Sequence, residues 1–163
     1  MKHSEIIALL PYTKPFLFVD SLEKVHKDGV EGSYQFKKDS YFYKGHFENN
    51  PITPGVLLTE CMAQIGVVSL GLFLIEQETK DPVDNALKTQ IAMSNTTIDF
   101  YTSVKPGERV TVTSEKIYFR FGKLRCKVIM MSAQHKLIAK GTIDGMIVKQ
   151  QYSAVNTHNK QEY

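Results

Sequence analysis

Hydrophobic and polar positions alternate in two parts of this chain, and one long apolar stretch separates the two parts. A first pair of strands is expected at 16–25 and 30–36, with the turn signal Asp28-Gly29 between them. Four more alternating segments follow the apolar stretch and predict strands at 89–102, 109–119, 124–132 and 137–148.

The apolar stretch, 55–75, contains a single charged residue, Glu60, and is apolar on nearly all sides. Thr53 is placed to cap a helix that begins with Pro54 and runs to about Gln77. A charged and a polar side chain, Glu60 and Gln64, are costly near the centre of a helix in lipid, so we expect a buried core helix and no membrane span.

Two strands, a long buried helix and four strands predict an α+β fold, in which an antiparallel sheet wraps around one central helix. A short helix capped by Ser4 precedes them. The length of 163 residues suits a single domain, which we place at 1–150, and a polar tail follows at 151–163.

Composition narrows the class of protein. A net charge of +3 is too small to indicate nucleic-acid binding, although it permits an acidic partner. No signal peptide is recognised near the N-terminus. The two cysteines, Cys61 and Cys126, lie in apolar surroundings and form neither a disulfide framework nor a metal motif, which favours a cytoplasmic protein.

Three candidate groups for chemistry lie between positions 46 and 60. Glu60 sits on a buried helix, where desolvation raises a carboxyl pKa and suits a general acid; the alternative is a structural glutamate bonded to a loop amide. His46 lies in the preceding loop and is a candidate base, although a lone loop histidine is more often solvated or structural. The helix start at Gly55 presents free N–H groups that can polarise a carbonyl oxygen. Together these groups suit proton abstraction next to a carbonyl with loss of a β-hydroxyl.

The same region resembles the FabZ-type 3-hydroxyacyl-[acyl-carrier-protein] dehydratases, whose signature runs GHF-P-G-x-P-x-x-PGVL-x-x-EAMAQ. The matching residues here are Gly45-His46-Phe47, Pro51, Pro54-Gly55-Val56-Leu57 and Glu60-Cys61-Met62-Ala63-Gln64. The N-terminal segment from Leu10 to Asp20 is similar to the family's LPHRYPFLLVD. The segment from Phe100 to Glu108 is similar to its F-x-x-P-V-x-PGD turn.

The resemblance implies a hot-dog fold and a dimer or a trimer of dimers, in which His46 faces Glu60 of the neighbouring chain. His46 would take the α-proton, Glu60 would protonate the leaving hydroxyl, and the Gly55 amide would hold the thioester oxygen. The implied substrate-binding residues are Gly55, Val56, Phe47, Pro54 and Gln64. The substrate would arrive on the phosphopantetheine arm of an acyl carrier protein, and no metal or other cofactor is implied.

Departures from the family pattern leave the acyl length and the pathway open, including fatty-acid-like polyene or pigment synthesis. Glu48-Asn49 replaces the family's Pro-Gly, Ser103 replaces a proline, and Cys61 replaces an alanine and reads as a small buried hydrophobe. Basic residues could dock an acidic carrier protein, or could simply be solvated surface. They form two groups, Lys37, Lys38 and Lys44, and Lys123, Arg125 and Lys127.

Three alternatives remain at this point. A hot-dog thioesterase would hydrolyse the thioester, but it has no need for an α-proton base such as His46. A non-catalytic acyl-binding subunit would need neither His46 nor Glu60. Isomerisation to the 3-enoyl product could use the same pair, although relatives that isomerise typically carry aspartate at the position of Glu60.

Overall fold

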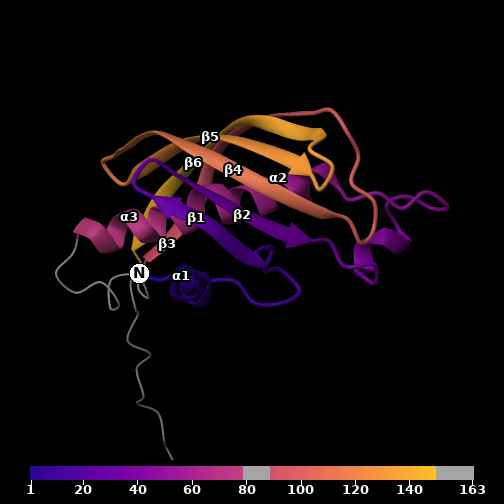
Figure 1. Ribbon diagram of the computed structural model, residues 1–163, viewed down its shortest axis with the longest axis horizontal. Helices are drawn as coiled ribbons and strands as arrows, with labels where there is room; N and C mark the ends of the chain where they lie inside the picture. Colours follow the sequence, from indigo (N-terminus) through magenta and orange to yellow (C-terminus); the bar gives the residue numbers. More distant parts are fainter. Residues whose placement is uncertain (79–88, 150–163) are drawn as a thin grey trace, which may run out of the picture.

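Six strands form one antiparallel sheet in the computed structural model, which describes residues 1–78 and 89–149 (Figure 1). Their order across the sheet is β1-β2-β4-β5-β6-β3, so β1 and β3 are the two edges. The strands are β1 (Ser21–His26), β2 (Gly29–Gln35), β3 (Thr89–Phe100), β4 (Arg109–Arg120), β5 (Lys123–Ser132) and β6 (Leu137–Lys149).

The central helix lies against the concave side of this sheet, as Figure 1 shows. It consists of α2 (Gly55–Ala63), a π-helical turn η2 (Gln64–Val68) and α3 (Ser69–Glu78). By length and composition it could cross a membrane, but 89% of its most apolar window is buried inside the protein. Its apolar surface is therefore covered by the sheet and by α1 (His3–Leu9), which packs on β1 and α3.

The π-helical turn packs closely against the sheet at Gly66. A Cβ added at Gly66 would lie 2.9 Å from Cγ1 of Val128 and 3.1 Å from Cβ of Ser114. A larger residue at this position would push the helix away from β4 and β5, because interiors are close-packed.

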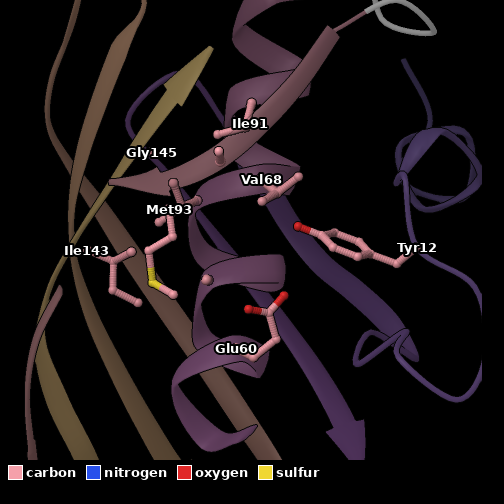
Figure 2. Close-up of a pocket in the computed structure, with 10 residues that line it drawn as sticks. Tyr12, Glu60, Val68, Ile91, Met93, Ile143 and Gly145 are labelled. Carbon is pink, nitrogen blue, oxygen red and sulfur yellow. The ribbon is translucent and has the colours of Figure 1, made fainter. Parts of the chain in front are cut away.

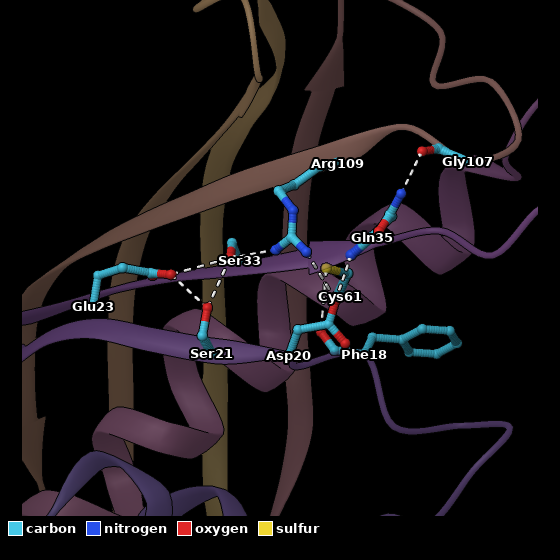
Figure 3. Close-up of polar contacts among 9 residues, drawn as sticks. All are labelled: Phe18, Asp20, Ser21, Glu23, Ser33, Gln35, Cys61, Gly107 and Arg109. Atoms are coloured by element: carbon cyan, nitrogen blue, oxygen red, sulfur yellow. Dashed lines mark hydrogen bonds and ion pairs between the residues drawn. The ribbon is translucent and has the colours of Figure 1, made fainter.

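A polar network ties the N-terminal segment to β2 and β4 on the outside of the sheet (Figure 3). Asp20 accepts the backbone N–H of Gln35 at 2.9 Å and lies 3.8 Å from the guanidinium of Arg109. Arg109 also donates to the hydroxyl of Ser33 at 3.0 Å. These contacts fix the segment that runs from the end of α1 to β1 over the start of the central helix.

The predicted hot-dog fold is confirmed, and two predicted boundaries in the N-terminal part of the chain were wrong. The first strand begins at Ser21, not at residue 16, because the Phe18 N–H bonds to the Gln64 side chain rather than to a neighbouring strand. The short helix begins at His3, with Lys2 rather than Ser4 as its N-cap. The strand predicted at 89–102 is continuous as β3 and contains a β-bulge between Met93 and Asn95. The loop predicted from Asp81 and the tail predicted at 151–163 lie outside the described residues.

Gly141 of β6 allows the edge strand β3 to pair closely. A Cβ at this position would overlap the carbonyl oxygen of Thr97, a backbone atom that cannot rotate away. We therefore expect Gly141→Ala to lower the free energy of unfolding by about 1–3 kcal/mol, measured by chemical denaturation.

Gly45→Ala is the matched control, because a Cβ at Gly45 meets nothing within 4 Å. Its unfolding free energy should stay within about 0.5 kcal/mol of the parent. Equal stability of the two variants would contradict this view of the β3–β6 pairing.

Candidate active site

His46 is held by its own loop in a defined orientation. The loop follows the 3₁₀ turn η1 (Tyr41–Lys44), and the His46 backbone bonds to Phe42 and Ile52. Its Nδ1 lies 2.9 Å from the carbonyl oxygen of Ile52. A carbonyl oxygen can only accept, so Nδ1 carries the proton and Nε2 presents its lone pair. This is the tautomer that a general base needs.

The ring of Phe47 stacks on the imidazole, with the ring centroids 3.9 Å apart and the planes 25° from parallel. The peptide bond between His46 and Phe47 is cis. Phe47 is half exposed, so one side of the stacked pair faces outward.

The central helix begins without a side-chain cap. The N-cap is Pro54, not Thr53 as predicted, and the helix starts at Gly55. The Thr53 side chain is unavailable for capping because its hydroxyl bonds to the hydroxyl of Tyr43 at 2.6 Å in the buried base of the loop. The Gly55 N–H consequently has no partner within the described part of the chain, and it lies at the positive end of the helix dipole.

His46 and this free helix start face the same cavity. The cavity has a volume of about 390 Å³, and we call it the His46 cavity. Its lining residues are His46, Phe47, Ile52, Thr53, Gly55, Leu58, Phe100, Tyr101, Thr102 and Ser103. A base and an unpaired backbone donor in one cavity can bind a carbonyl compound and remove a neighbouring proton.

Glu60 lies on the next turns of α2, held by Gln64. The Gln64 amide donates to Oε1 of Glu60 at 2.9 Å and to the carbonyl oxygen of Phe16 at 2.9 Å. Its own oxygen accepts the Phe18 N–H at 2.8 Å. Gln64 is completely buried, and the π-helical turn begins at this residue. It thus joins the carboxylate to the N-terminal segment.

Glu60 opens into a second cavity, of about 240 Å³, shown in Figure 2. This Glu60 cavity is lined by Tyr12, Glu60, Ala63, Val67, Val68, Ile91, Ala92, Met93, Ile143 and Gly145. It shares no lining residue with the His46 cavity. Within the described part of one chain, therefore, the two predicted catalytic residues line different cavities.

The other predicted site residues fall in different places. Gly55 and Phe47 line the His46 cavity. Val56 is 76% exposed on α2, and neither Val56 nor Pro54 lines either cavity. Gln64 is completely buried and lines neither cavity. Its side-chain amide bonds to protein groups, one of which is Glu60.

Sequence reasoning missed several lining residues. Tyr12 and Met93 come from the N-terminal segment and from the edge strand, far in sequence from the helix. Tyr101 and Thr102 follow directly after Phe100, which the motif did include. Tyr12 directly follows Leu10-Pro11 of the N-terminal segment that resembles the family, and that position could have drawn attention to it.

Comparison with known proteins places this arrangement in a family. The FabA-like domain matches residues 10–149, which is most of the chain. The chain belongs to the FabA-like family. A 3-hydroxyacyl-[acyl-carrier-protein] dehydratase FabZ from Caldicellulosiruptor bescii is 30% identical over 128 residues, covering 78% of this chain and 85% of the relative. A FabZ from Caulobacter vibrioides is also 30% identical, covering 90% and 87%.

Solved structures agree on the fold of this family member. A chain of the dehydratase heterocomplex ApeI:P from Xenorhabdus doucetiae is similar with a TM-score of 0.69 and 11% identity, covering 90% of this chain and 91% of that one. The fluoroacetyl-CoA thioesterase FlK is similar with a TM-score of 0.58 and 12% identity, covering 77% and 88%. At these identities the likeness concerns the fold alone.

The buried Gln64 amide gives a testable consequence. Gln64→Leu leaves the buried Phe18 N–H and the part-buried Phe16 carbonyl without their partner, so we expect a loss of about 1–3 kcal/mol in the free energy of unfolding. Gln77→Leu, at an exposed position near the end of the same helix, should change it by less than about 0.5 kcal/mol. Thermal or urea denaturation measures both, and an equally stable Gln64→Leu protein would refute the bracing role.

Proposed function

We propose that this protein dehydrates 3-hydroxyacyl thioesters, carried by an acyl carrier protein, to trans-2-enoyl thioesters. The observation that carries the proposal is the pairing of a histidine with a free Nε2 and an unpaired Gly55 N–H in one cavity. FabA-like family membership and the FabZ relatives support the same reaction. Synthesis of fatty acids, or of fatty-acid-like polyenes or pigments, is the proposed setting.

The reaction starts with the thioester carbonyl oxygen accepting the Gly55 N–H. The helix dipole adds to the polarisation, which stabilises the enolate as it forms. Nε2 of His46 removes the proton from the carbon next to the carbonyl. The Ile52 carbonyl, at 2.9 Å from Nδ1, holds the ring in place and stabilises the imidazolium that results.

Elimination is completed at the next carbon, where the carbon–oxygen bond breaks. Glu60 gives its proton to the departing hydroxyl, which leaves as water, and the electron pair from the former C–H bond forms the new double bond. Gln64 orients Glu60 through its 2.9 Å hydrogen bond and does not itself need to touch the substrate. Phe47, with Val56 and Pro54 at the helix start, would line the path of the substrate.

Two copies of the chain are needed to bring these groups together. The edge strand β3 carries Met93 at the Glu60 cavity and Phe100 at the His46 cavity, and most of its residues are exposed. Two β3 strands could pair antiparallel with Thr97 at the centre of the pairing. Phe100 lies three residues from Thr97 on one side and Met93 lies four residues from it on the other, so this pairing would bring Phe100 close to the partner subunit's Met93. The bulge between Met93 and Asn95 would absorb the one extra residue on that side. Each site would then combine His46 of one chain with the partner's Glu60, in a homodimer or a trimer of dimers.

The carrier protein would dock on the basic residues next to the His46 loop. Lys44 ends η1 directly before that loop, and Lys37 and Lys38 are exposed just ahead of it. The second basic group is less available, since Lys123 and Arg125 lie 2.9 and 3.4 Å from the buried carboxylate of Asp144. Two free buried cysteines, Cys61 and Cys126, fit the reducing cytoplasm in which we place the protein.

The direct test is incubation of the protein with a 3-hydroxyacyl carrier-protein thioester, followed by mass spectrometry. We expect loss of water with the thioester intact. His46→Ala should lower the rate roughly 10²–10⁴-fold, the usual effect of losing a general base. Glu60→Gln should lower it comparably.

His135→Ala is the matched control, because His135 is exposed in the β5–β6 turn and should leave the rate unchanged. Release of free acid would point to a thioesterase instead. A rate that does not depend on His46 would refute the assignment of the base.

A further inference from the structure

The Glu60 cavity contains a second polar group that the reaction described above does not use. Of the residues that line it, only Tyr12 and Glu60 have polar side chains. Figure 2 shows Tyr12 reaching across from the N-terminal segment, with its hydroxyl pointing toward the central helix on the side where the Glu60 carboxylate lies. An otherwise apolar cavity with two converging polar groups is typical of a site that orients a ligand.

The position of Tyr12 relative to Glu60 is fixed by packing and hydrogen bonding. Its ring contacts that of Phe16, with the centroids 6.3 Å apart. The backbone carbonyl of Phe16 accepts from Gln64, and the same amide nitrogen donates to Glu60. One buried amide therefore holds both the segment that carries the phenol and the carboxylate.

The Tyr12 hydroxyl is available to a ligand as a donor. It has no hydrogen-bond partner among residues 1–78 and 89–149. Burial, reinforced by the negative charge of Glu60, raises the pKa of Tyr12 to about 12. The phenol therefore keeps its proton at any pH at which the protein works, and it can donate but not act as a base.

We propose that Tyr12 donates a hydrogen bond to the 3-hydroxyl oxygen of the substrate and so holds the leaving group against Glu60. This inference rests on the proposed dehydration. The phenol keeps its own proton throughout, while Glu60 supplies the one that converts the hydroxyl into water. As the carbon–oxygen bond lengthens, negative charge grows on that oxygen and the hydrogen bond from Tyr12 strengthens. A substrate without a 3-hydroxyl group would gain nothing from Tyr12.

The family segment LPHRYPFLLVD can be aligned with this chain through Leu10-Pro11 and Pro15-Phe16. In that alignment the family has histidine where this chain has Tyr12. A phenol with a raised pKa supplies a neutral donor across the whole working range of pH. An imidazole, whose usual pKa is about 6.5, changes charge within that range. The hydroxyl is thus a property of this chain rather than of the motif it shares.

The test compares two thioesters of equal chain length in the wild-type protein and in Tyr12→Phe, a variant that keeps the ring and removes the oxygen. For the 3-hydroxyacyl thioester we expect kcat/KM to fall roughly 10- to 100-fold, because a hydrogen bond to developing charge is lost. For the saturated acyl thioester, which has no 3-hydroxyl, the inhibition constant should stay within about twofold. Tyr41→Phe removes the hydroxyl of a residue that is 74% exposed and lines neither cavity, so it should change neither value.

Each outcome has a distinct meaning. An unchanged kcat/KM in Tyr12→Phe overturns the inference while leaving dehydration standing. An equal loss for both thioesters overturns it as well, because that result assigns Tyr12 a packing role only. If the wild-type protein removes no water from any 3-hydroxyacyl thioester, the proposed function itself fails and this inference with it.

Discussion

A long helix with an apolar surface on nearly all sides has to be enclosed by the rest of the chain. The central helix, Gly55–Glu78, meets this requirement by lying in the curve of a six-stranded sheet, with α1 closing part of the remaining side. Burying a single large aliphatic side chain contributes about 1.5–3 kcal/mol, so the many buried side chains of this helix dominate the favourable side of folding. The strand order, the close approach at Gly66 and the path of the N-terminal segment all follow from enclosing it.

Enclosing the helix also determines how its polar groups are used. Glu60 and Gln64 cannot be solvated in the ordinary way, so Gln64 makes three hydrogen bonds to protein groups and Glu60 opens into a cavity. At the start of the same helix, Thr53 bonds to Tyr43 instead of capping it, which leaves the Gly55 N–H free. The Glu60 carboxylate in its cavity and the free Gly55 N–H cost stability locally, and both are groups that the proposed dehydration needs.

Local patterns in the sequence predicted the helix and the strands well. An apolar run indicates a buried helix, and alternation of apolar and polar residues indicates a half-buried strand, and both patterns can be read directly from the sequence. They did not predict that the backbones of Phe16 and Phe18 would bond to Gln64 rather than extend β1, because that choice depends on a side chain more than forty residues away in the chain. The motif located His46, Gly55 and Glu60. It could not predict Tyr12 as part of the Glu60 cavity, since that contact depends on how the N-terminal segment packs across the helix.

The separation of His46 and Glu60 into two cavities gives the account its central claim, that a complete site requires two chains. The most direct measurement mixes His46→Ala and Glu60→Gln chains, each inactive alone, under conditions in which dimers exchange subunits. If sites are shared, half of the dimers are hybrids and each hybrid holds one intact site, so the mixture should recover about one quarter of the wild-type rate. If each chain holds its own site, every site in every dimer lacks one group. A mixture as inactive as its components would then contradict the account.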